Sequence, residues 1–174
     1  MEPKTIEPKT KMKTHAKLGF SSMDTAEMVT TMDKLLANYH VFYQKLRHFH
    51  WNVRGQDFFD LHQKFEELYT RGLVDIDNVA ERIRVFGAFP MGTLKEYLAT
   101  SEITETVTKL TAMEMTREVL NDMEILNSFM IDVVDAAGEI GDVATMDLIN
   151  SMMRTMEKEH WMLTAWLNEP KRVD

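Results

Sequence analysis

The residues best suited to metal chemistry are concentrated between positions 50 and 81. Two histidines, His50 and His62, lie twelve residues apart, and Glu66 follows about one helical turn after the second. Asp77 and Glu81 come next, four residues apart. Imidazole nitrogens and carboxylate oxygens are ligands that suit iron, zinc or manganese. The chain has no cysteine, which excludes disulfides, thiolate metal sites and a cysteine nucleophile.

Helical geometry divides these candidates into two groups. Around the axis of one helix, His62 and the three carboxylates lie within about 100° of one another, so they share one face. Along the axis, His62 and Asp77 are about 22 Å apart, too far to bind one ion. A hairpin turn would bring His50 level with His62, and the two can form one half-site with Glu66 as a possible third member. Asp77 and Glu81 form the other half-site, so a second copy related by a twofold axis must complete each site.

More ordinary interpretations exist for each of these residues. A lone surface histidine is usually only solvated, and Asp/Glu pairs on helices usually form salt bridges. A different metal site is also conceivable, because di-iron bundles use a Glu-x-x-His motif on each of two helices. This chain has one such spacing, Glu157 to His160, while Arg84 stands where Glu81 would need a histidine. A monomeric di-iron oxygenase built on Glu157 and His160 stays as an alternative, although its site would be incomplete.

Apolar residues that recur every three to four positions predict four long helices. Their expected spans are about 24–52, 57–86, 111–138 and 142–170. Capping-box spacing at Asp24 and Thr111 and a capping residue at Asp57 mark three of the starts. Gly138 is expected to stop the third helix. These helices would carry the candidate ligands on fixed faces.

The connection between the second and third helices, residues 87–110, is unusually long. A short helix is expected within it, around residues 94–98. Short loops join antiparallel neighbours, whereas a connection of this length can cross the bundle and make the flanking helices parallel. No segment alternates apolar and polar residues with a period of two. The expected fold is therefore all-α, a ferritin-like four-helix bundle with a long crossover between helices two and three.

Length and composition fit one domain with two short tails. The 174 residues are expected to divide into a mobile basic N-terminal tail (1–20), the bundle (21–170) and a short C-terminal tail (171–174). The N-terminal tail holds five lysines and two glutamates, whereas the whole chain has a net charge of −8. An acidic body is not expected to bind duplex DNA, because phosphates repel it. No apolar run approaches the ~18 residues of a membrane span or forms a signal-peptide core, so neither membrane insertion nor export is expected.

Several motifs closely resemble the Dps family, the DNA-protection-during-starvation proteins or mini-ferritins. They are His-Trp-Asn-Val-Arg-Gly at 50–55, Leu61-His62, Asp77-x-x-Ala80-Glu81-Arg82 and the stretch 160–167. The resemblance covers essentially the whole chain after the tail. It implies a cytoplasmic dodecamer with tetrahedral symmetry that oxidises ferrous iron, preferably with hydrogen peroxide. A ferric mineral would be stored inside this shell, which would protect against oxidative damage.

The resemblance also implies which residues bind iron. Carried over by position, His50 and His62 are iron ligands from one subunit. Asp77 and Glu81 are ligands from its twofold mate. Glu66 occupies a place where the family often has aspartate, and its longer side chain could move or weaken the second iron position.

Further roles implied by the resemblance lie outside the ligand set. Trp51 stands beside the site in this family, where it either packs or takes part in one-electron chemistry that limits radical escape. Asp142 and Asp147 flank the start of the fourth helix, where the family builds acidic threefold pores, and Asp135 is a further candidate. A ring of aspartates would focus cations. The ordinary alternatives are a helix cap for Asp142 and a solvated side chain for Asp147.

DNA binding is implied only for some members of the family, through lysine-rich tails. Twelve copies of a basic tail on one shell could act by multivalency. The two glutamates of the tail and the acidic body oppose this. The alternative function is a nucleoid-associated DNA-binding protein that acts through its basic N-terminal tails and in which the metal site is incidental.

Overall fold

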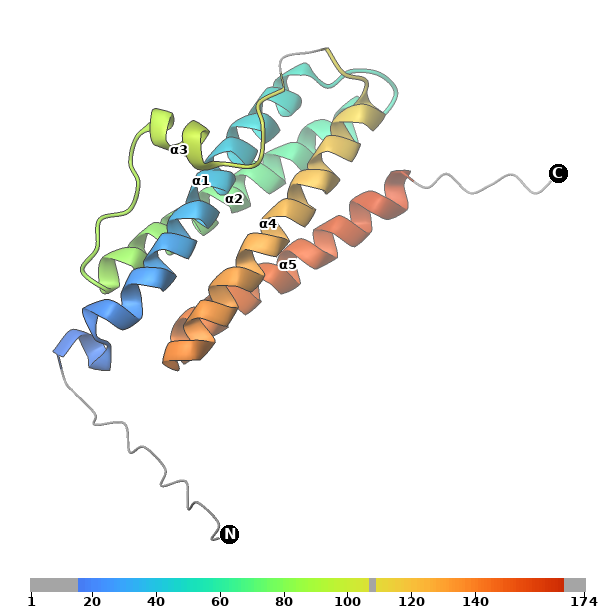
Figure 1. Cartoon of the computed structure of the whole chain (residues 1–174). Coiled ribbons are helices and arrows are strands. Elements are labelled where there is room, and N and C mark those ends of the chain that lie inside the picture. Colours follow the sequence, from blue (N-terminus) through green and yellow to red (C-terminus); the bar gives the residue numbers. More distant parts are fainter. Residues whose placement is uncertain (1–15, 107–108, 168–174) are drawn as a thin grey trace, which may run out of the picture.

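The computed structural model describes residues 16–106 and 109–167, and every regular element within them is a helix. The long helices are α1 (Ser22–Asn52), α2 (Phe58–Val85), α4 (Ala112–Ile140) and α5 (Val143–Leu167). The short ones are the 3-10 helix η1 (Ala16–Gly19) and α3 (Leu94–Thr100), which lies between α2 and α4. The predicted four-helix bundle with a short helix in its long crossover is confirmed (Figure 1). None of the helices in these segments is long and apolar enough to cross a membrane.

The core is packed around α1, which contacts α2, α3 and α4. Its buried apolar side chains recur at helical spacing: Met28, Met32, Leu35, Tyr39, Phe42, Leu46 and Phe49. The neighbouring helices turn a similar face inward, with Phe65, Val79, Ile83, Leu126 and Met130 fully buried. Burying one side chain of this size contributes about 1.5–3 kcal/mol. This packing fixes the register between α1 and α2, the two helices that carry the candidate ligands.

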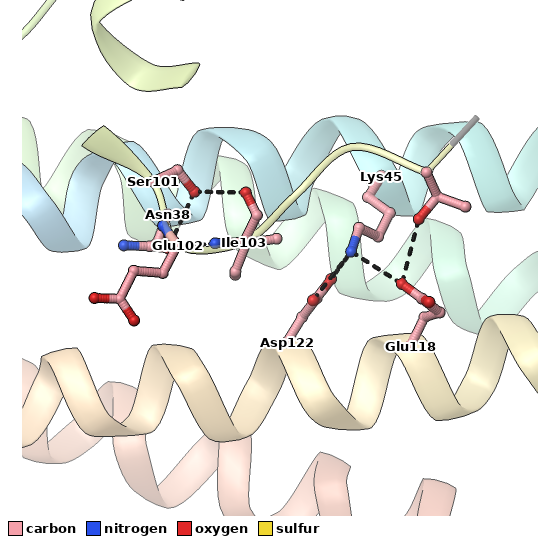
Figure 2. A network of polar contacts seen from close by, with 8 residues as sticks. Asn38, Lys45, Ser101, Glu102, Ile103, Glu118 and Asp122 are labelled. Carbon is pink, nitrogen blue, oxygen red and sulfur yellow. Dashed lines mark hydrogen bonds and ion pairs between the residues drawn. The ribbon is translucent and has the colours of Figure 1, made fainter. Parts of the chain in front are cut away.

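The crossover determines the directions of the helices. α1 and α2 form an antiparallel hairpin, and the chain then returns through α3 so that α4 runs parallel to α2 (Figure 1). Asn38, fully buried on α1, holds the chain just after α3. Its Oδ1 accepts hydrogen bonds from the backbone N–H groups of Glu102 (2.9 Å) and Ile103 (3.0 Å) and from the Ser101 hydroxyl (3.0 Å) (Figure 2). The long connection is therefore tied to the core.

The end of α4 differs from the prediction. Gly138 was expected to stop this helix, but the helix continues to Ile140 and ends at Gly141, which has a φ of 72°. The Gly141 N–H donates to the Gly138 carbonyl (3.1 Å), and the Asp142 N–H donates to the Ala137 carbonyl (2.8 Å). This pair of bonds is the Schellman arrangement, which requires a left-handed residue just past the helix. Gly138 is tolerated inside the helix because a helical glycine costs only about 1 kcal/mol.

The predicted helix starts have mixed outcomes. Thr111 forms the expected capping box, because its side chain accepts from the Glu114 N–H while Glu114 accepts from the Thr111 N–H. Asp57 is the N-cap residue of α2, as predicted, but its side chain makes no capping hydrogen bond. The side chain of Asp24 lies outside the described residues.

The tails are only partly described. Phe20 meets the ring of Phe86 edge-on, with centroids 5.7 Å apart, so packing begins one residue before the predicted boundary at 21. Residues 1–15, with four of the five tail lysines, lie outside the described residues, as do 107–108 and 168–174. The mobility predicted for the N-terminal tail and the C-terminal tail at 171–174 therefore stay predictions.

Candidate metal centre

The first half-site forms where α1 passes into α2. His50 lies in the last turn of α1 and is buried, while His62 lies a turn into α2 and is half-buried. Between the helices, Gly55 has a φ of 116°, a conformation that residues other than glycine rarely adopt. This turn reverses the chain tightly enough to place the two imidazole rings face to face. Their centroids are 3.8 Å apart, with 20° between the ring planes.

Two reciprocal hydrogen bonds fix the orientation of both rings. His50 Nδ1 lies 2.8 Å from the His62 carbonyl oxygen, and His62 Nδ1 lies 2.8 Å from the His50 carbonyl oxygen. A carbonyl can only accept, so each Nδ1 must carry a hydrogen and donate it. In the neutral ring this leaves the lone pair on Nε2, the form in which histidine binds a metal. The backbone therefore supplies the orienting contacts that metal-binding histidines usually receive from a second layer of groups.

Glu66 completes a group of three ligands. One ligand atom each of His50, His62 and Glu66 lies within 4.8 Å of the other two, and this is the one such group of three or more within the described segments. The Tyr69 hydroxyl donates to Glu66 Oε1 at 3.4 Å, and its ring meets His50 edge-on with centroids 5.4 Å apart. Desolvation and the neighbouring Glu66 carboxylate raise the pKa of Tyr69, which keeps this donor protonated at neutral pH. The arrangement offers two nitrogens and a carboxylate to a cation.

Sequence reasoning missed Tyr69 and the two backbone carbonyls. Tyr69 follows Glu66 by three residues, so its place on the same helix face could have been read from spacing. The carbonyl contacts carry no sequence signal, because they depend on the register between α1 and α2.

Asp77 and Glu81 do not join this group. Both are exposed on α2, and Asp77 follows His62 by fifteen residues of continuous helix, a rise of about 22 Å. Within the described residues no histidine lies with them in a metal-binding group. The chain thus presents two separated sets of potential ligands.

Trp51 lies beside the group but outside the core. Its side chain is 57% exposed, so within one chain it has little packing role. The Arg47 guanidinium lies 4.9 Å from the centroid of its ring and 5.4 Å from that of Tyr43. Arg47 therefore bridges two aromatic side chains near the half-site through cation–π contacts.

The three aspartates proposed for a pore differ in accessibility. Asp142 is buried, pairs with Arg82 at 2.7 Å and receives hydrogen bonds from the Thr145 hydroxyl and backbone N–H. Although burial opposes ionisation, the contacts with Arg82 and Thr145 hold the pKa of Asp142 below its ordinary value. Its carboxylate is thus occupied as a cap of α5, the ordinary alternative, and it is not available to line a pore in this arrangement. Asp135 and Asp147 are exposed.

The alternative site at Glu157 and His160 lies at the surface between α4 and α5. His160 Nε2 is 3.3 Å from Glu124 Oε1, and the side chains are 34% and 69% exposed. The bundle interior holds a different polar cluster, in which Lys45 on α1 pairs with Asp122 and Glu118 on α4. An ammonium group there does not suit a di-iron centre, because it repels cations. The described residues therefore do not form the oxygenase site considered as an alternative.

Comparisons with known proteins agree with this architecture. A family model described as a ferritin-like domain matches residues 30–173. General stress protein 20U of Bacillus subtilis is 38% identical over 141 residues, which cover 81% of this chain and 97% of that protein. DNA protection during starvation protein 2 of Bacillus anthracis is 38% identical over 143 residues, covering 82% and 98%.

Solved structures show the same similarity. The Dps protein from Vibrio cholerae O1, described as a member of the ferritin-like diiron-carboxylate superfamily, has a TM-score of 0.85 and 37% identity. The match covers 90% of this chain and 98% of that one. A Dps protein from Bacillus brevis has a TM-score of 0.82 and 38% identity, covering 86% of this chain and all of that one.

Proposed function

This chain belongs to the Dps proteins of the ferritin-like family, and from that premise we propose that it oxidises Fe(II) and stores the product as a ferric mineral. Iron is here a substrate and a cargo. The observation that carries the proposal is the pair of histidines whose Nδ1–H groups are held by each other's backbone carbonyls. Both rings keep an Nε2 lone pair for a metal, and Glu66 adds a carboxylate. The protection against oxidative damage expected of such a protein would follow from removing Fe(II) and peroxide together.

The donor set fits iron oxidation. Imidazole and carboxylate bind Fe(II), while carboxylate oxygen favours the harder Fe(III) product. Three ligands on one chain leave coordination positions open for an oxidant and bind weakly enough for the product to move on. Hydrogen peroxide, the proposed oxidant, takes two electrons and two protons to become two water molecules. Two Fe(II) ions at one site supply one electron each, which avoids the one-electron reduction that releases hydroxyl radical.

The second half of each site is proposed to come from another copy of the chain. Asp77 and Glu81 are exposed carboxylates, and among the described residues they share no metal-binding group with a histidine, while Glu66 is the one carboxylate grouped with the two histidines. A twofold axis would bring each set to the other and create two identical sites per dimer. This requirement supports the proposed dodecamer, in which each subunit belongs to one such dimer. Light scattering tests the size, since the shell should have twelve times the 20.3 kDa mass of the chain.

The decisive test removes the histidine pair. In the double variant His50→Ala/His62→Ala, the peroxide-dependent loss of Fe(II) should slow to the rate in buffer without protein. His48→Ala is the matched control, because His48 lies on the same helix and outside the ligand group. An unchanged oxidation rate in the double variant, with the assembly intact, would rule out the proposed function.

Iron entry and the cellular location of the protein are further parts of the proposal. We keep Asp135 and Asp147 as candidate pore residues because both are exposed, whereas Asp142 is occupied by Arg82 and Thr145. Slower mineral growth in Asp147→Asn shells, with oxidation at the centre unchanged, would support this role. The cytoplasmic location implied by the family belongs to the same proposal.

DNA binding is the second candidate function. The relatives named for DNA protection and the five lysines of residues 1–20 favour it, while the net charge of −8 opposes it. Deleting residues 1–15 distinguishes the two functions, since plasmid retardation at low salt should disappear while iron oxidation continues. Full-length protein that fails to retard plasmid even at low ionic strength would remove this candidate.

A further inference from the structure

Potential metal-binding side chains also line a cavity between α4 and α5, although their ligand atoms do not all lie within 4.8 Å of one another as those of His50, His62 and Glu66 do. The cavity has a volume of about 290 Å³ and is lined by Met123, Glu124, Asn127, Met156, Glu157 and His160. None of these residues belongs to the His50–His62–Glu66 group. The lining contains one imidazole, two carboxylates and one amide, and it contains no lysine or arginine. Its composition therefore favours a cation over an anion.

Two of the ligands are already in contact across the cavity. His160 Nε2 on α5 lies 3.3 Å from Glu124 Oε1 on α4. The His160 side chain is 34% exposed and that of Glu124 is 69% exposed, so the pair is open to solvent on one side. A hydrogen bond between an imidazole and a carboxylate joins the same two atoms that would bind a metal ion placed between them. An ion can replace the proton here without a change in the backbone.

Glu157 and Asn127 extend this pair. Glu157 precedes His160 by three residues, so the two side chains project from one face of α5, and this spacing is used by metal sites in helix bundles. Glu157 is exposed, and its carboxylate has to move to join the pair. On α4, Asn127 Oδ1 is buried and accepts no hydrogen bond within the described residues.

The nearby ion pair between Glu159 and Lys64 does not involve these ligands. Glu159, between Glu157 and His160 in sequence, pairs with Lys64 on α2 at a distance of 2.5 Å. That ion pair lies on the side of α5 that faces α2. The side of α5 that faces α4 thus keeps His160 and Glu157 for another partner.

We propose that the α4–α5 cavity binds one divalent first-row transition-metal ion, such as Zn²⁺ or Fe²⁺, through His160, Glu124 and Glu157. One nitrogen and carboxylate oxygens suit this class of ion better than Ca²⁺ or Mg²⁺, which take oxygen ligands. The site is mononuclear and binds an ion without a second metal to share electrons. It is independent of the proposed function at His50 and His62.

Zn²⁺ binding to the full-length protein tests the proposal. The protein carries His50→Ala and His62→Ala to silence the candidate centre, is freed of metal with a chelator and is titrated with Zn²⁺ by calorimetry. Adding His160→Ala or Glu124→Gln should remove one equivalent of Zn²⁺ per chain or weaken its binding at least tenfold. Glu157→Gln should weaken it less, because that carboxylate must move to reach the ion. X-ray absorption at one equivalent should show an imidazole that disappears with His160→Ala.

Two controls separate binding from folding. Glu139→Gln removes an exposed carboxylate on α4 outside the cavity and should leave the titration unchanged. Circular dichroism should show the same helix content in all variants. Equal Zn²⁺ stoichiometry and affinity with and without His160 would overturn the proposal. In a chain with His50 and His62 intact, His160→Ala should not alter iron oxidation, so failure at this site and failure of the proposed function give different results.

Discussion

At the scale of single residues, the candidate centre depends on which ring nitrogen of each histidine carries the hydrogen atom. Each histidine donates from Nδ1 to the other's carbonyl, so both present Nε2 without help from any carboxylate side chain. The sequence predicted that the two histidines and Glu66 could meet, and the structure brings them within 4.8 Å. The sequence could not predict the tautomer, because every residue has a backbone carbonyl and only the fold shows which two accept from the histidines. The role of these residues in iron binding stays a prediction.

Glu66 offers a direct test at this scale. Glu66→Gln keeps the length of the side chain and its oxygen acceptor for Tyr69 but removes the negative charge. We expect the Fe(II) concentration for half-maximal oxidation to rise about tenfold, since a charged ligand is lost. Thermal stability should change little, because Glu66 is exposed. Initial rates against Fe(II) concentration provide the measurement.

Glu67 is the matched control for that substitution. It is the next residue, is also exposed, and accepts only from Gln63 and Lys64 on its own helix. Glu67→Gln should leave the iron dependence unchanged. Equal effects of the two substitutions would indicate that only the general negative charge of the surface matters.

At the scale of helices, sequence patterns located the elements better than they located the polar contacts within the core. The apolar period placed all four helices, and the Thr111 capping box marked the start of α4. Lys45 and Asp122, by contrast, look like surface charges in the sequence, yet both are buried. They are 77 residues apart, and only the packing of α1 against α4 brings them together. Likewise, the sequence does not show that Gly141 rather than Gly138 adopts the left-handed conformation.

The attachment of the crossover to α1 gives a prediction of stability. Asn38→Leu removes the oxygen that accepts from the backbone of Glu102 and Ile103, and leaves the buried N–H of Ile103 and the part-buried N–H of Glu102 unpaired. We expect the free energy of unfolding to fall by about 1–3 kcal/mol, mostly through Ile103, since one unpaired buried group costs about 1–3 kcal/mol. Denaturant unfolding measures this change. Ser101→Ala is the control, because it removes one donor and leaves the two backbone bonds, so an equal loss in both variants would contradict the explanation.

The buried ion pair between α1 and α4 gives a prediction of pH dependence. Lys45 Nζ lies 2.7 Å from Asp122 and 3.2 Å from Glu118, so one ammonium serves two carboxylates (Figure 2). Burial raises the pKa of Asp122 from 3.8 to about 6, although the bonds from Lys45 oppose this. The folded protein therefore binds this proton more tightly than the unfolded chain does. The resulting stability is fully present below pH about 4 and is lost as pH rises through about 6, a change of roughly 3 kcal/mol.

Asp122→Asn should remove that part of the pH dependence. Asparagine resembles the protonated carboxyl, and Glu118 remains to pair with Lys45. Unfolding by denaturant should therefore give similar stability for both proteins near pH 4, and the variant should be the more stable above pH 7. A variant that is clearly less stable than the original at pH 7.5 would show that the ion pair outweighs the cost of burying the charge.

At the scale of the whole molecule, the spacing of the ligands predicts that a complete site needs a second chain. The histidine half-site and the Asp77–Glu81 pair are separated by about 22 Å of continuous helix. One chain offers a binding group of three ligands, and a twofold partner would extend it. The separation was predictable from the sequence because helix rise is constant. The surfaces that would join the copies were not predictable from the sequence, because an exposed apolar residue does not indicate which surface it meets.

Mixed assemblies can test whether two chains share each site. Chains with His50→Ala/His62→Ala and chains with Asp77→Asn/Glu81→Gln should each oxidise Fe(II) slowly when assembled alone. When the two are unfolded, mixed equally and reassembled, half of the dimers combine both kinds of chain, and one of the two sites in each such dimer is intact. About a quarter of the full activity should therefore return. The control adds Asp77→Asn/Glu81→Gln to the histidine variant, so that no pairing creates an intact site and no activity returns. If separately inactive chains stay inactive after mixing into shells of normal size, each site lies within one chain and the twofold arrangement is wrong.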